Sequence, residues 1–144
     1  MIKRDTIRLL EECELGIKMG TSSISDMLPY AKSGELKRTL KSSEEEHKRL
    51  GEECRAMLSR YGSEGKRPPL MATVGTKMKT AMRLGMHPTD RTVAELTTDG
   101  CNMGIKSLSG YLNRYTAAEE RAKDIAKKLI AMEDKLGTDV RGYL

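Results

Sequence analysis

A carboxylate and an imidazole stand three residues apart at Glu44 and His47. Side chains at that spacing lie on one face of an α-helix, where both can bind the same metal ion. The three cysteines, Cys13, Cys54 and Cys101, have no CxxC spacing, which predicts buried free thiols rather than a zinc site or a disulfide framework. Cys54 lies two turns beyond His47, about 10 Å along one helix, too far for a direct thiol–imidazole pair.

No complete catalytic motif is present: the sequence has neither a glycine-rich phosphate loop nor a Gly-x-Ser-x-Gly elbow. The composition is 38% hydrophobic and 33% charged, with no Trp or Phe and with 10 Met, which is typical of long amphipathic helices with charged outer faces. No apolar stretch approaches the roughly 20 residues of a membrane span, and no signal peptide opens the chain. We therefore predict one all-α domain, cytoplasmic and non-catalytic, over residues 1–144.

Apolar residues spaced alternately by three and four predict two antiparallel helix pairs, here called hairpin one and hairpin two. Hairpin one is expected over about 4–61, with its first helix over about 4–32, capped by Asp5 or Thr6. Hairpin two is expected over about 89–142, with Thr89 or Asp90 as the cap of its first helix and a tight turn around residues 115–116. A short break at Ser33-Gly34 separates the helices of hairpin one.

The crossover, residues 62–88, cannot continue a helix at its start, because residues 62–69 contain two glycines and Pro68-Pro69. A short extra helix is expected over Leu70–Leu84, before Gly85.

The two hairpins share short sequence matches. Cys13–Lys18 matches Cys101–Lys106 at an offset of 88 residues, and Leu50-Gly51 matches Leu136-Gly137 at an offset of 86. Each match falls at the same place in its own hairpin, which indicates a duplicated helical hairpin. Two hairpins joined by a long connection form a four-helix bundle with one crossover.

With these features the chain resembles the ferritin-like superfamily, in particular its small bacterial four-helix-bundle members of unknown function. The resemblance implies metal ligands from a Glu on each first helix and Glu-x-x-His on each second helix, which here selects Glu14, Glu44, His47 and Glu133. The set is incomplete, because Asn102 matches Glu14 and the last helix has no histidine. We therefore expect no resident cofactor; the alternative is a degenerate site for iron, manganese or zinc.

The net charge of +5 is concentrated in one part of the chain. Residues 60–91 carry seven basic and two acidic residues, and the rest of the chain is balanced. The alternative function that this suggests is binding of an anionic partner or membrane surface through Lys66, Arg67, Lys77, Lys79 and Arg83. No aromatic residue interleaves these charges, so stacking on nucleic-acid bases is not indicated. The favoured expectation is a ferritin-like bundle that acts by binding a protein partner or by self-association.

Overall fold

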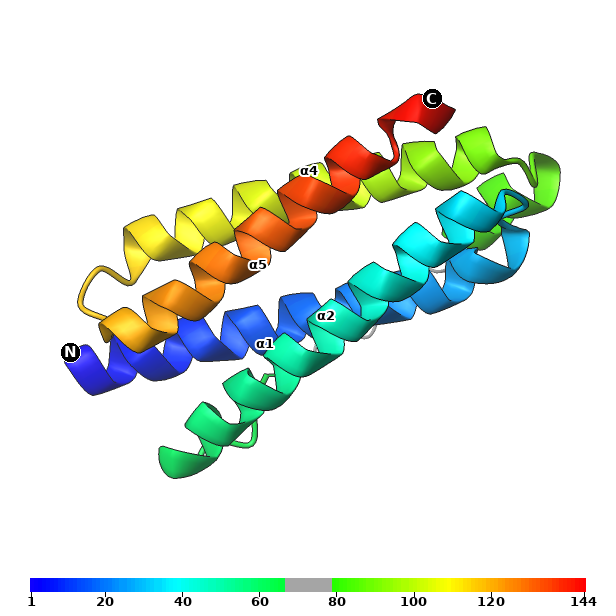
Figure 1. The fold of residues 1–144 in the computed structure, drawn as a ribbon. Helices are drawn as coiled ribbons and strands as arrows, with labels where there is room; N and C mark the ends of the chain where they lie inside the picture. The colour runs from blue at the N-terminus through cyan, green and yellow to red at the C-terminus, as the bar shows by residue number, and fades with distance from the viewer. Residues whose placement is uncertain (67–78) are drawn as a thin grey trace.

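The computed structural model describes residues 1–66 and 79–144, and within them every regular element is helical. The long helices are α1 (Ile2–Met27), α2 (Gly34–Arg60), α4 (Asp90–Arg114) and α5 (Glu120–Asp139) (Figure 1). Short 3₁₀ turns follow α1 and α5, at Leu28–Tyr30 and Arg141–Tyr143, and residues 79–86 are also helical. The predicted all-α class is confirmed.

The helices pack as two antiparallel hairpins, α1 with α2 and α4 with α5 (Figure 1). Helix α4 begins at the end of the bundle where α2 begins and runs in the same direction, while α5 runs parallel to α1. The end of α2 and the start of α4 therefore lie at opposite ends of the bundle, as the predicted crossover requires. The two termini lie at opposite ends of the molecule.

The helix ends differ in part from the sequence expectations. Helix α1 begins at Ile2, ahead of the two residues expected to cap it, and becomes a 3₁₀ turn at Leu28 because Pro29 cannot continue the α-helical hydrogen bonds. The Thr89 hydroxyl caps α4 as expected, accepting a hydrogen bond from the Thr92 N–H at 3.1 Å. The extra helix continues through Gly85 to residue 86; its predicted part over residues 70–78 lies outside the described residues.

The core consists of two apolar clusters. One gathers residues near the start of α1 and the start of α5, including Leu10, Cys54 and Leu129. The other lies around Leu36 and Val93, at the opposite end of the bundle. Between the clusters α2 contributes His47 and α5 contributes Glu133, both buried. A polar layer thus interrupts the apolar core halfway along the helices.

Burial repeats between the second helices of the hairpins. Six buried residues of α2 correspond to five buried residues of α5 and to Val140, which directly follows it, at a constant offset of 86, the offset expected from the Leu-Gly match. These pairs are Leu36 and Ala122, Leu40 and Ala126, Ser43 and Leu129, His47 and Glu133, Leu50 and Leu136, and Cys54 and Val140.

The first helices also repeat, but at an offset of 84 rather than the expected 88. At 84 five pairs of residues are buried in both helices: Leu9 and Val93, Leu10 and Ala94, Cys13 and Thr97, Ile17 and Cys101, Ile24 and Leu108. At 88, buried Glu14 would correspond to exposed Asn102. The expected alignment of Cys13 with Cys101 is therefore wrong by about one helical turn, a shift that leaves a residue on the same helix face.

Hydrogen bonds at the two ends of the bundle obey the same offsets. The Thr6 hydroxyl accepts a hydrogen bond from the Glu119 N–H at 2.9 Å, and the Asp90 carboxylate accepts one from the Ser33 N–H at 3.1 Å. Ser33 and Glu119 are the residues that precede α2 and α5. Each hairpin therefore binds the connecting loop of the other, and the hairpins are related by an approximate two-fold axis.

Asp5 reinforces one of these contacts, because its carboxylate accepts a hydrogen bond from the Ala117 N–H at 3.1 Å. Asp5 and Thr6, expected as caps, therefore hold the α4–α5 loop instead. Asp90 likewise binds the α1–α2 loop, accepting a second hydrogen bond from the Lys32 N–H at 2.6 Å.

Candidate functional site

The central polar contact joins His47 of α2 to Glu133 of α5. The His47 Nε2 lies 2.8 Å from the Glu133 Oε1, and its Nδ1 lies 2.7 Å from the backbone oxygen of Ser43. His47 is 1% exposed and Glu133 is 9% exposed. The Ser43 hydroxyl lies 3.3 Å from Nδ1 as well. A carbonyl oxygen and an ionised carboxylate accept hydrogen bonds, so the arrangement suits an imidazolium ring that donates from both nitrogens.

Burial lowers the pKa of His47, but the hydrogen bonds from its ring to Glu133 and to the Ser43 carbonyl outweigh this effect. The pKa of His47 is therefore raised above its ordinary value. The Cys101 thiol lies beside the same carboxylate, and burial first, then the charge of Glu133, raises the pKa of Cys101. The thiol therefore stays protonated and unreactive at neutral pH.

Two glycines make room for the pair. A Cβ on Gly20 of α1 would lie 3.3 Å from the His47 Cδ2, and a Cβ on Gly104 of α4 would lie 3.4 Å from the Glu133 Oε2. Gly20 and Gly104 are themselves related by the offset of 84, so each charged side chain packs on the glycine of its own hairpin. Sequence reasoning noticed Gly104, together with Gly16, as a glycine that lets helices approach closely, but it missed Gly20.

Glu14 belongs to a different cluster, between α1 and α2. Both of its carboxylate oxygens accept hydrogen bonds from the Arg55 guanidinium at 3.2 Å, and the Lys18 ammonium lies 3.5 Å away. Arg55 also donates to the Ser63 carbonyl. Glu14, only 3% exposed, thus holds the start of the crossover through Arg55. His47 bonds to Ser43 and Glu133 and makes no hydrogen bond to Glu14.

Glu44 faces away from the polar layer. Its carboxylate accepts a hydrogen bond from the Ser25 hydroxyl at 2.8 Å and lies 3.6 Å from the Lys48 ammonium. Among the four expected ligands, only His47 and Glu133 are in contact. The other two are held elsewhere: each carboxylate of the set has an internal cation or donor, and both His47 nitrogens lie within hydrogen-bond distance of protein groups. Residues 1–66 and 79–144 contain no group of three or more His, Cys, Asp and Glu side chains arranged to hold a metal ion.

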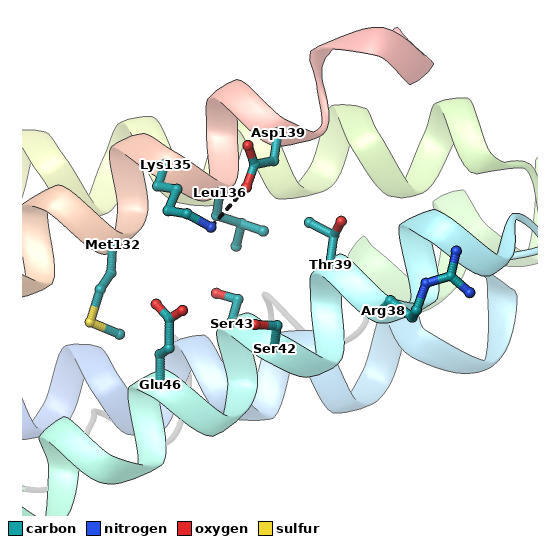
Figure 2. A pocket seen from close by; sticks show the side chains of 9 residues that line it. All are labelled: Arg38, Thr39, Ser42, Ser43, Glu46, Met132, Lys135, Leu136 and Asp139. Carbon is teal, nitrogen blue, oxygen red and sulfur yellow. Dashed lines mark hydrogen bonds and ion pairs between the residues drawn. The ribbon is translucent and has the colours of Figure 1, made fainter.

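A polar groove of about 220 Å³ runs between α2 and α5 beside the central pair (Figure 2). Ser43, which touches His47, and Leu136 lie on its two sides, and the Lys135–Asp139 ion pair lies along the α5 side. Charges of both signs line the groove, and Figure 2 shows Glu46 and Arg38 toward its opposite ends.

The basic residues expected to bind an anionic partner are partly used within the fold. Lys66 pairs with Glu12, and Arg83 pairs with Glu95 at 2.6 Å. Lys79 is exposed. Arg67 and Lys77 lie outside the described residues.

Comparison with protein-family models, with curated proteins and with solved structures finds no match to this chain. The fold itself defines an all-α protein built from two antiparallel helical hairpins. No helix in the described part of the chain is both long enough and apolar enough to cross a membrane.

Proposed function

We propose that this chain is a ferritin-like helical bundle that works through its surface, by binding a protein partner or by self-association, and not through a metal centre. The order and directions of the helices support the class: two hairpins joined by one return along the bundle. The proposal of a role without a metal centre is supported by one observation: each candidate metal ligand is bonded to another group of the fold. Glu14 is neutralised by Arg55, Glu44 by Lys48, and Glu133 by His47.

Metal analysis tests directly whether the chain works without a metal centre. The full chain is expressed with iron, manganese and zinc supplied, purified without chelator and analysed by mass spectrometry for elements. We expect far less than one ion per chain. Stoichiometric metal that disappears in His47→Gln, with helix content unchanged by circular dichroism, would overturn the proposal. Glu45→Gln, an exposed position on the same helix, is the matched control and should leave the metal content unchanged.

Binding of an anionic lipid surface is a second candidate role, favoured by one observation. Met82 and Met86 are 65% and 69% exposed, one helical turn apart in the helix that also carries exposed Lys79. Apolar side chains beside cations suit an anionic membrane surface.

Vesicle sedimentation with phosphatidylserine, compared with pure phosphatidylcholine, tests this second role. We expect binding to the anionic vesicles that is lost when Lys77, Lys79 and Arg83 are changed to Glu. The control variant reverses three cations of α5 instead, Lys127, Lys128 and Lys135. Equal binding by the two triple variants, or no binding by the parent chain, would exclude the role.

A further inference from the structure

The approximate two-fold axis passes through the central polar layer, where His47 meets its own counterpart at the offset of 86, Glu133. A residue and its repeat equivalent meet only at such an axis. If two copies of hairpin one were packed on each other in this way, His47 would face a second His47. If two copies of hairpin two were packed together, Glu133 would face a second Glu133.

The contacts at the ends of the bundle do not distinguish these arrangements. Thr6 and Asp90 each accept a hydrogen bond from a backbone N–H of the opposite loop, at Glu119 and Ser33. A backbone N–H is present whichever hairpin supplies the loop, so like hairpins could form the same bonds. The apolar clusters are equally permissive, because buried hydrophobic surface is non-directional.

We propose that the His47–Glu133 contact is the specificity element of this fold: it pairs hairpin one with hairpin two and rejects pairing of like hairpins between two copies of the chain. Two ion pairs join the hairpins in residues 1–66 and 79–144, His47–Glu133 and Glu53–Lys128. At the offset of 86, Lys128 corresponds to Ser42 and Glu53 to Asp139, so of the two only the His47–Glu133 contact changes from opposite to like charges when the hairpins are alike. The site is buried, since His47 is 1% exposed and Glu133 is 9% exposed. Two like charges placed there would repel each other in a medium that screens them weakly. Specificity achieved by penalising the wrong partner is well attested for buried polar groups in helical assemblies.

Charge variants of the full chain reproduce each pairing inside one molecule. Glu133→His places two imidazoles at the axis, and His47→Glu places two carboxylates there. We expect each to lower the folding equilibrium constant by roughly a hundredfold or more, Glu133→His most strongly at low pH and His47→Glu most strongly at high pH. The exchanged double variant, His47→Glu with Glu133→His, restores opposite charges, and its constant should be about tenfold or more above both single variants.

Recovery in the exchanged variant separates pairing specificity from a simple structural need for histidine at position 47. If the exchanged variant is no more stable than the two single variants, the proposal fails.

An apolar double variant, His47→Leu with Glu133→Leu, tests the rejection of a second copy. Replacing a buried ion pair by apolar residues commonly preserves stability, so this variant should fold. It lacks the charge that rejects like hairpins. Refolded over a range of chain concentrations, it should show more intermolecular association by light scattering than the parent chain. Association equal to that of the parent at every concentration would overturn the proposal.

Discussion

Replacing Glu133 by Gln should reverse the sign of the pH dependence of stability near neutrality. In the parent chain Glu133 and the Ser43 carbonyl hold the pKa of His47 above its ordinary value of about 6.5. Between that value and the raised pKa, the folded state holds a proton that the unfolded state has lost. Stability is then full below about pH 6.5 and falls as the pH rises, by up to about 1.4 kcal/mol per pH unit.

In Glu133→Gln the negative charge is absent, and burial, which lowers the pKa of His47, becomes the larger influence. The folded state then loses its proton before the unfolded state does, so stability falls as the pH drops below about 6.5. The Gln amide oxygen can still accept a hydrogen bond from Nε2. Near pH 6.5 the free energy of unfolding of Glu133→Gln should therefore be about 2 kcal/mol lower than that of the parent chain. This is less than the roughly 3–5 kcal/mol typical of a buried ion pair that loses one partner.

Urea denaturation at intervals from pH 5.5 to about 7.5 measures both profiles, in a range where thiols of the unfolded chain, with a pKa of about 8.5, are mostly protonated. Nuclear magnetic resonance of the two histidines adds a direct reading, with exposed His87 as the reference signal. Parallel profiles for the parent and Glu133→Gln would refute the assignment of His47 as an imidazolium held by Glu133.

Three further predictions concern the rest of the fold. Thr6→Val and Asp90→Ala remove equivalent bonds at the two ends, and each should cost about 1–2 kcal/mol in chemical denaturation; additive losses are expected because the sites lie at opposite ends. Gly65→Ala should destabilise strongly, because Gly65 has φ +92° and its Cβ would collide with Glu14, whereas Gly62→Ala, at φ +73° with open space, should cost less. A thiol reagent at pH 8 should label the native chain much more slowly than the unfolded chain, because burial raises the pKa of Cys54 to about 12; rapid native labelling would contradict this.

The helices and their pairing were predictable because the alternation of three and four fixes the buried face of each helix. The register of the repeat was not. A shift of four residues keeps a side chain on nearly the same helix face, so offsets of 84 and 88 fit the apolar pattern almost equally. The matching letters of Cys13–Lys18 and Cys101–Lys106 favoured the wrong one, and only burial and contacts identify the counterpart of Ile17 as Cys101.

The candidate site was predictable to the same extent. The inward position of His47 follows from its place in the apolar pattern of α2. The partner of His47 depends on which helix packs against α2 and in what register. The spacing of residues within one helix does not specify either. Glu14 also lies on the inward face of its helix, but its carboxylate accepts a hydrogen bond from Arg55 of the adjacent helix and does not meet His47. A carboxylate therefore became part of an ion pair where the family resemblance implied a ligand.

The approximate two-fold axis has a consequence for the order of the chain. The two hairpins are nearly interchangeable in space. The existing connection joins the end of hairpin one to the start of hairpin two. The two-fold axis relates it to a second possible connection, from the end of hairpin two to the start of hairpin one, whose ends also lie at opposite ends of the bundle. That path is about the length of α1, about 40 Å, which roughly a dozen extended residues can span. A circular permutant with hairpin two first, a new linker after Leu144 and new termini within residues 67–78 would keep both end contacts and the His47–Glu133 pair. Connectivity is therefore the part of this architecture most open to rearrangement.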